Sequence, residues 1–484
     1  MNFSRENQLK NIDQNNVYDL LVIGGGVVGA AILEMSSNSG INSILIEKND
    51  FSSGASSRST KLLHGGIRYL PQLRFGLVRE SLKEQKILKK LLGDLYIPIN
   101  LLAPIYEDDG FADLPKILQK KFIINISFKV GLMLYDILGS RKKIERHRNV
   151  TKQDTAQLLP MLKKEKLKTS YLFQDAQTDD AKLVLSLLRN SVEINGSTGI
   201  NYMEITNIEK QSEFYLVALR DKIEKKNYMI RVKKIIAATG VHNLPKGYTK
   251  KSSKIKHSGG AHIVLKGDPL RIEGNGVLLP KTEDERVMFI LPWFGNTIVG
   301  TTDTEKFSGS LDNPYANEKD IAYLKYHVKK YFNVSRVEHI SSWSGVRALI
   351  DESSTSTKNI SRGHFFKEID NGFIQIAGGK LTGFRVIAKE SLEAIYPKSF
   401  SLSKLRFVDE LMDIENKYNK NDLEKCINHY CVAKPIDYML RRTHLSWFQK
   451  GGGEEELDKI IKKFDIPNIK QETIKELKSE SLVS

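Results

Sequence analysis

The feature that most constrains the fold of this chain is a glycine-rich turn near the N-terminus. Residues 18–23 (YDLLVI) are branched or apolar and stop abruptly at glycine, which is typical of a buried parallel strand. Gly24, Gly26 and Gly29 then form a G-x-G-x-x-G pattern that leads into the helix-like residues 30–35. In this context the glycines permit a tight turn, close approach of the backbone to a pyrophosphate, and close packing of helix on strand. The pattern predicts a Rossmann-like, dinucleotide-binding α/β domain with the phosphates at the helix N-terminus.

A second apolar run carries an acid where dinucleotide-binding folds hold a ribose. Residues 43–47 (SILIE) are predicted to form the next strand, and they end in Glu47 at about the 20-residue spacing that such folds show. A carboxylate at this position accepts hydrogen bonds from the hydroxyls of an adenosine ribose. These residues alone leave both NAD and FAD open.

The length and the cysteine content narrow the class of protein. A chain of 484 residues provides about two to four domains at roughly 100 to 200 residues each. Its only cysteines are Cys426 and Cys431, so we expect no disulfide framework, no zinc site and no metal. Residues 1–16 lack a signal-peptide core, and the longest uncharged apolar stretch, residues 20–33, is shorter than the roughly 18 residues of a membrane span. We therefore expect a cytoplasmic protein that does not cross a bilayer.

The charge of the chain is strongly basic and unevenly distributed. The sequence has 74 Lys and Arg against 58 Asp and Glu, a net charge of +16, which favours an anionic partner or substrate. Residues 111–170 alone hold 14 basic and 5 acidic side chains. Within them, residues 117–138 mix large apolar side chains with lysines and run into Arg141–Lys143. The segment is either an amphipathic helix packed on its own protein or an element that binds an anionic membrane surface.

A hydroxyl-rich loop follows the second predicted strand and shows a family resemblance. Residues 52–60 are rich in serine, and residues 61–70 read KLLHGGIRYL. This pattern resembles the FAD-dependent (aerobic, quinone-linked) glycerol-3-phosphate dehydrogenases. Further segments match the same family in order, at residues 179–185, 289–293, 300–303, 344–347 and 378–382. The resemblance covers about residues 18–390 and favours FAD over NAD.

The resemblance implies an α/β fold with a discontinuous Rossmann-like FAD-binding domain, an antiparallel β-sheet substrate cap (α+β) and a short helical C-terminal domain. The FAD-binding domain is expected at residues 17–93, 150–243 and 342–397. The cap is expected at 94–149 and 244–341, and the helical domain at 401–484. Short apolar runs separated by turn residues between 262 and 301 agree with an antiparallel cap.

The activity that the resemblance implies is oxidation of sn-glycerol 3-phosphate to dihydroxyacetone phosphate, with hydride transfer from C2 to N5 of FAD and electrons passed to a membrane quinone. The enzyme would lie at the inner face of the cell membrane as a peripheral protein. A soluble oxidase that uses O2 and releases H2O2 remains an alternative, and a flavin amine oxidase of related fold is a third. A nucleic-acid partner is not expected, because the basic segment lacks interleaved stacking aromatics and no RNA-binding module is recognisable. A homodimer and covalent attachment of FAD are left open.

The site residues are carried over from the resemblance. Arg347 and Lys380 are expected to polarise the substrate and handle its proton, with His64 and Tyr69 in the same pocket. The expected contacts of the substrate and its phosphate are Arg68, Arg347, Arg362 and His262, since guanidinium forks suit phosphate. The expected cofactor contacts are Gly24, Gly26, Gly29, Glu47, Ser56, Ser57, Ser59, Lys61, Gly240, Gly379, Lys380, Leu381 and Thr382.

Some roles and positions are less certain on the sequence alone. The general base is left open between a histidine, His64 or His262, and a lysine whose pKa is lowered by burial. Arg347 and Arg362 each have an alternative as an ion-pair or surface residue. The chain also departs from the family pattern at four places, listed as Val241-His242, Gly259-Gly260-Ala261, Ala348 and Phe384.

Overall fold

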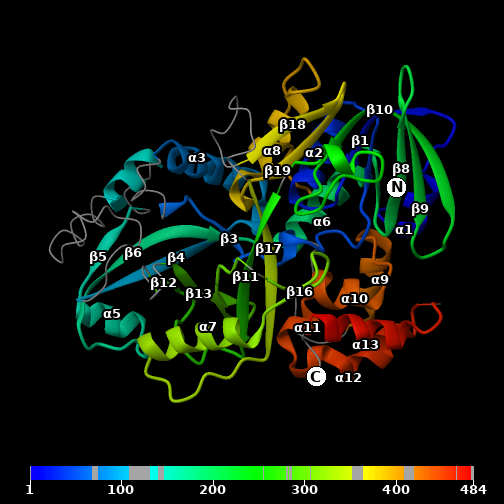
Figure 1. The fold of residues 1–484 in the computed structure, drawn as a ribbon. Coiled ribbons are helices and arrows are strands. Elements are labelled where there is room, and N and C mark those ends of the chain that lie inside the picture. Colours follow the sequence, from blue (N-terminus) through cyan, green and yellow to red (C-terminus); the bar gives the residue numbers. More distant parts are fainter. Residues whose placement is uncertain are drawn as a thin grey trace.

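The computed structural model describes residues 2–67, 75–107, 131–139, 146–253, 255–279, 282, 286–305, 307–350, 364–407, 419–464 and 466–480. Two large sheets lie side by side in it, with a group of helices from the C-terminal part of the chain below one of them (Figure 1). The α/β fold with an antiparallel second sheet and a helical C-terminal region is the one that the sequence predicts.

The predicted N-terminal strand lies in the middle of the first sheet. Strand β1 (Val17–Ile23) pairs in parallel with β2 (Ser43–Ile46) on one side and with β10 (Asn227–Ala237) on the other. The strand order is β18-β19-β10-β1-β2-β7; outside this order β9 pairs antiparallel with β10, and β8 pairs antiparallel with β9. The remaining strands are β7 (Thr198–Ile200), β8 (Met203–Lys210), β9 (Tyr215–Asp221), β18 (His364–Asp370) and β19 (Phe373–Gly378).

Both faces of this sheet are buried, which explains why β1 is continuously apolar rather than alternating. Leu20 and Val22 belong to the core beneath the helices, whereas Leu21 and Ile23 belong to a second core shared with β8 and β9. On the helical face, α2 packs against both α6 and α8. These helices are α2 (Val27–Asn38), α6 (Asp180–Glu193) and α8 (Phe384–Glu393).

The second sheet is antiparallel except for one parallel pair, β12 with β4. Its order is β17-β11-β14-β13-β12-β4-β6-β3, with β5 beside β6. The strands are β3 (Leu62–Leu63), β4 (Ile97–Tyr106), β5 (Arg148–Val150), β6 (Leu167–Gln177), β11 (Ile255–Leu265), β12 (Gly276–Leu279), β13 (Met288–Trp293), β14 (Asn296–Gly300) and β17 (Ser341–Ile350). Three strands of this sheet, β3, β6 and β17, come from residues that are expected in the flavin domain. The second sheet thus combines residues from both expected domains, and the domain ranges stay a proposal.

Shorter elements complete the described fold. Helix α7 (Glu318–Tyr331) packs against β11 and shares a core with residues of α5 (Lys152–Leu158). The others before residue 400 are α1 (Arg5–Lys10), η1 (Ala55–Ser57), α3 (Phe75–Leu91), η3 (Gly93–Leu95), η6 (Thr249–Lys251), β15 (Ser308–Gly309), β16 (Pro314–Tyr315) and η9 (Leu381–Gly383). None of the described helices is long and apolar enough to cross a membrane.

The C-terminal helices are fastened to the body by buried ion pairs. Asp50, which follows β2, contacts both Arg441 and Arg442, and Arg58 pairs with Glu480. Burial raises the pKa of Asp50, but Arg442 and Arg441 outweigh burial and lower it to about 2. The helices are α9 (Lys420–His429), α10 (Pro435–Asp437), the π-helix η10 (Tyr438–Arg442), α11 (Leu445–Phe448), η11 (Lys450–Gly453), α12 (Glu454–Ile461) and α13 (Ile469–Ser479).

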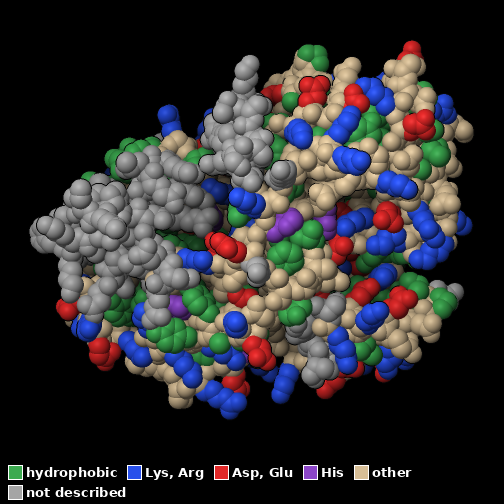
Figure 2. All heavy atoms as spheres, in the orientation of Figure 1, with side chains coloured by type: hydrophobic (Ala, Val, Ile, Leu, Met, Phe, Trp, Pro, Cys, Tyr) green, Lys and Arg blue, Asp and Glu red, His purple; other side chains and the backbone are tan. Residues whose placement is uncertain are grey.

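The basic surplus is distributed over the described surface. On the face shown in Figure 2, Lys and Arg side chains are interspersed with Asp and Glu rather than collected in one patch. Much of the most basic part of the sequence, residues 108–130 and 140–145, lies outside the described residues.

Candidate functional site

The glycine loop approaches the sheet and the helix too closely for a side chain. Gly24 has φ +107°, and a Cβ atom there would lie 2.5 Å from Ala238 O. A Cβ atom at Gly29 would overlap the carbonyl oxygen of Gly24. Gly26 is the N-cap of α2 and supplies no side-chain cap, which leaves N–H groups of the first turn available to an anion. The loop therefore has the shape that a bound pyrophosphate requires.

Glu47 and Ser56 lie on either side of this loop. Glu47 Oε2 accepts the N–H of Gly25 at 2.7 Å, and its Oε1 accepts the N–H of Asn49 at 2.8 Å. Burial raises the pKa of Glu47. Each carboxylate oxygen keeps a second lone pair, so the side chain can still accept a hydrogen bond from a ribose. Ser56 Oγ accepts the N–H of Val27 at 3.0 Å and thereby joins the serine loop to the first turn of α2.

The remainder of the serine loop is held by Asp180 at the start of α6. Ser59 donates to Asp180 through its hydroxyl at 2.6 Å and through its N–H at 3.1 Å. Lys61 Nζ lies 2.5 Å from Asp180 Oδ1 and donates to the carbonyl of Ser57 at 2.6 Å. The Lys61 side chain is buried and lies over the rings of two tryptophans. The structure thus gives Lys61 an internal ion pair, so its expected cofactor contact would be made by its backbone rather than its ammonium group.

Residues from three distant parts of the chain form the exposed side of the site. Gly240 follows β10, Gly379 follows β19, and both are exposed. Lys380 begins the turn that contains Leu381 and Thr382, and Thr382 donates to the carbonyl of His64 at 3.2 Å. An extended dinucleotide fits this arrangement. The N–H groups of the glycine loop, the carboxylate of Glu47 and the exposed Gly240 and Gly379 could all contact it.

Arg347 lies on β17 with its guanidinium over neighbouring backbone. Its NH2 donates to Thr301 Oγ1 at 3.1 Å and to Thr302 O at 3.2 Å, and NH1 lies 3.1 Å from Asp303 Oδ1. The side chain as a whole is 38% exposed. A Cβ atom at Gly260 would lie 2.5 Å from NH2, so a side chain at this position would crowd the guanidinium.

His262 is buried within the second sheet. Its Nε2 lies 3.0 Å from Thr60 Oγ1, its ring stacks on Trp343 at 5.2 Å, and its exposure is 2%. Burial lowers the pKa of His262 to about 3, with Arg347 and Lys61 contributing, so the ring is neutral near pH 7. This placement favours a role in holding Thr60 over direct contact with a substrate.

Three of the expected site residues cannot be placed. Arg68, Tyr69 and Arg362 lie outside the described residues. The described residues contain no group of three or more His, Cys, Asp or Glu side chains that could hold a metal ion.

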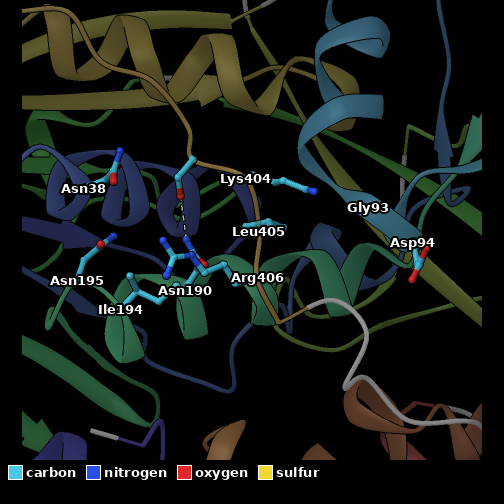
Figure 3. A pocket seen from close by; sticks show the side chains of 10 residues that line it. Asn38, Gly93, Asp94, Asn190, Ile194, Asn195, Lys404, Leu405 and Arg406 are labelled. Atoms are coloured by element: carbon cyan, nitrogen blue, oxygen red, sulfur yellow. Dashed lines mark hydrogen bonds between the residues drawn. The ribbon is translucent and has the colours of Figure 1, made fainter.

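A surface cavity lies at the other end of α2 from the glycine loop. It has a volume of about 590 Å³ and lies at the C-terminal ends of α2 and α6, where Asn190 donates to Ser403 at 2.9 Å (Figure 3). None of the expected site residues lines it. Helix α2 has 12 residues and so separates its two ends by about 18 Å. The candidate site is therefore at the glycine loop and the segments that follow β10 and β19, not at this cavity.

Sequence reasoning missed the residues that anchor the serine loop. Asp179 and Asp180 were recognised as part of a matching segment, but no role was assigned to them. Trp293, Trp343 and His444, which surround Lys61 or Asp179, were also not included. The adjacent acids at a predicted helix N-terminus were the one available signal, because buried neighbouring carboxylates require partners.

Comparisons with known proteins agree with this geometry. Residues 19–385 match the family described as FAD dependent oxidoreductase. The chain is 34% identical over 401 residues to the aerobic glycerol-3-phosphate dehydrogenase of Staphylococcus aureus (strain USA300), covering 81% of this chain and 69% of that protein.

Two solved structures show the same fold. The glycerol-3-phosphate dehydrogenase from Bacillus halodurans, complexed with FAD, superposes with a TM-score of 0.73 at 24% identity, over 99% of this chain and 98% of that one. The L-alpha-glycerophosphate oxidase from Mycoplasma pneumoniae, with FAD bound, superposes with a TM-score of 0.63 at 18% identity, over 80% of this chain and 97% of that one.

Proposed function

The chain belongs to the FAD-dependent oxidoreductases, in the glycerol-3-phosphate dehydrogenase/oxidase family, and on that premise we propose that it oxidises sn-glycerol 3-phosphate to dihydroxyacetone phosphate and passes the electrons to a membrane quinone. Its cofactor is FAD, and bound FAD supplies the acceptor for the hydride that leaves C2. The chain's own residues bind and orient the two molecules.

The observation that supports the substrate assignment best is the guanidinium of Arg347. It is fixed by Thr301, Thr302 and Asp303, and the side chain as a whole is partly exposed. A planar fork held in this way suits a phosphate or a substrate oxygen. We assign Arg347 and Lys380 to substrate polarisation and proton handling, with His64 and Tyr69 in the pocket and Arg68 and Arg362 as phosphate contacts.

The acceptor is assigned to quinone, with oxygen as the second candidate. The Staphylococcus aureus relative is named an aerobic dehydrogenase, which supports the respiratory assignment. Oxygen is kept as the alternative because the Mycoplasma pneumoniae protein, which has the same fold, is named an oxidase. The two candidates differ in what reoxidises the flavin, and so one experiment separates them.

We expect the yellow protein to bleach when sn-glycerol 3-phosphate is added without oxygen, because the flavin accepts the hydride. Adding a soluble quinone to one aliquot should restore the colour rapidly, whereas air added to another should act slowly. The measurement is anaerobic absorption spectroscopy, with sn-glycerol 1-phosphate as the matched control substrate. Rapid recovery with air and release of H2O2 would make the protein an oxidase, and failure to bleach would overturn the substrate assignment.

A peripheral membrane site is the third part of the proposal. Within the basic segment the described residues 131–138 form a helix that buries Leu132 and Tyr135 and exposes Met133 by 47% and Ile137 by 69%. Apolar side chains exposed four residues apart share one helix face. An apolar face flanked by lysines and arginines suits the interface of an anionic leaflet.

We expect the purified protein to sediment with vesicles that contain phosphatidylglycerol, because basic side chains near an anionic surface contribute about 1 kcal/mol each. A variant with five changes to glutamine should stay in the supernatant; the five are Lys120, Lys121, Arg141, Lys142 and Lys143. The matched control carries five changes in the C-terminal helices, at Lys450, Lys459, Lys462, Lys475 and Lys478, and should still sediment. Unchanged sedimentation of the first variant would mean that the segment packs internally.

A further inference from the structure

Two adjacent carboxylates at the start of α6 are fully buried, and each is neutralised from a different part of the chain. Asp180 is 0% exposed and receives Ser59 and Lys61 from the serine loop. Asp179 is 1% exposed, and its Oδ2 lies 2.6 Å from Nε2 of His444 in the C-terminal helices. Burying a charge is costly unless a partner compensates it, so both partners are needed to keep this pair of acids ionised.

The geometry of His444 indicates a charged ring. Its Nε2 faces the carboxylate of Asp179, and its Nδ1 lies 3.0 Å from the carbonyl oxygen of Leu440. Both ring nitrogens therefore face acceptors, and only the imidazolium has two N–H donors. The ring is 1% exposed and lies among Trp293, Phe294 and Phe448, and in such apolar surroundings its contact with Asp179 is stronger than it would be in water.

A second cation, Lys182, lies farther from the Asp179 carboxylate than His444 does. Lys182 Nζ lies 4.0 Å from Asp179 Oδ2 and also over the ring of Phe294. Burial raises the pKa of Asp179, but His444, followed by Lys182 and Lys61, outweighs burial and holds it well below the usual range. His444 is thus the main countercharge of Asp179.

The two acids influence each other because they are neighbours on the chain. Burial raises the pKa of Asp180, Lys61 lowers it, and the charge of Asp179 raises it. If Asp179 lost its countercharge, the two adjacent buried carboxylates would have to share Lys61, which lowers the pKa of both acids. Sharing would weaken the pair between Lys61 and Asp180.

A weaker pair between Lys61 and Asp180 would also affect the serine loop. Its ammonium group holds the carbonyl of Ser57 at 2.6 Å, and Ser57 ends the short helix η1. The preceding residue, Ser56, accepts the N–H of Val27 at the first turn of α2. Polar contacts therefore connect the C-terminal helices with the glycine loop, joined by two stretches of backbone, one between Asp179 and Asp180 and one between Ser57 and Ser56.

We propose that His444 is a positioning residue for FAD: its imidazolium neutralises Asp179, which keeps Asp180 paired with Lys61 and the serine loop aligned with the cofactor. The C-terminal helices thereby contribute a charge to the cofactor site without touching it. The proposal rests on FAD binding and does not depend on the substrate or the electron acceptor.

The test is the affinity of the full-length apoprotein for FAD, measured by titration with FAD and flavin fluorescence. His444→Gln keeps a donor near Asp179 but removes the charge, and we expect its dissociation constant for FAD to rise about tenfold. The matched control is His429→Gln, because His429 also lies in the C-terminal helices, in α9, pairs with Glu193 at the end of α6, and is partly exposed. Its FAD affinity should stay unchanged.

A double variant separates a charge effect from a structural one. Asn at position 179 still caps α6 and needs no countercharge, so Asp179→Asn combined with His444→Gln should bind FAD about as tightly as the unmodified protein. If His444 only holds the C-terminal helices in place, the double variant will bind FAD no better than His444→Gln. That result, or an unchanged FAD affinity of His444→Gln, would overturn the proposal. If His444→Gln fails to fold, the double variant alone decides, and its failure to bind FAD would also count against the proposal.

Discussion

Replacing Arg347 by alanine should reduce kcat/KM for sn-glycerol 3-phosphate by about a thousandfold, because loss of a charged hydrogen-bonding contact costs about 2–5 kcal/mol. FAD should remain bound, since Arg347 lies on β17 of the second sheet and its guanidinium contacts residues 259 and 301–303. Steady-state kinetics give the first quantity, and the visible flavin spectrum of the purified variant gives the second.

Two control variants separate the charge of Arg347 from its planar shape and from its ion pair with Asp303. Arg347→Lys keeps the positive charge but loses the planar fork, so we expect activity between those of the alanine variant and the unmodified protein. Asp303→Asn removes the acidic neighbour of the guanidinium and tests whether the arginine serves mainly as an ion-pair residue. Full activity of Arg347→Ala would remove this residue from the site.

Replacing Gly29 by alanine should abolish FAD binding and markedly destabilise the first sheet. A Cβ atom at this position would overlap the carbonyl oxygen of Gly24, and backbone cannot move aside as a flexible side chain can. Forcing extra volume into a close-packed site typically costs 1–3 kcal/mol, and about 3 kcal/mol or more is expected here because the obstacle is backbone. The flavin content of the purified protein and its thermal unfolding measure the two effects.

The matched control is Gly76→Ala in α3. A Cβ atom there meets nothing within 4 Å, and alanine is a better helix former than glycine by about 1 kcal/mol. This variant should retain FAD and unfold at an equal or higher temperature. A normal flavin content in Gly29→Ala would show that α2 can shift away from the loop, contrary to the proposed packing.

The local elements of the flavin-binding region could be predicted from the sequence. The strand at residues 18–23, the glycine loop and the strand ending at Glu47 each have a pattern that spans only a few residues. Such patterns report local backbone geometry, which depends on neighbours in the chain. The ordered series of matching segments then indicated FAD and the family, and the comparisons confirm both.

The sequence was less informative about how side chains far apart in the chain compensate one another. The motif predicts Lys61 at the cofactor but does not predict that its ammonium group pairs with Asp180. His262 was expected at the substrate, and its ring lies between Thr60 and Trp343. A basic or aromatic residue in a motif has several satisfactory environments, and its local pattern does not choose among them.

By itself, the sequence determined the glycine loop, the parallel strands of the first sheet, the cofactor and the family. Only the tertiary structure decided that Asp179 faces His444, 265 positions away, while the adjacent Asp180 faces Lys61. The physical reason is that helix and strand periodicities depend on near neighbours in the chain, whereas a buried carboxylate must find its partner wherever packing brings a cation.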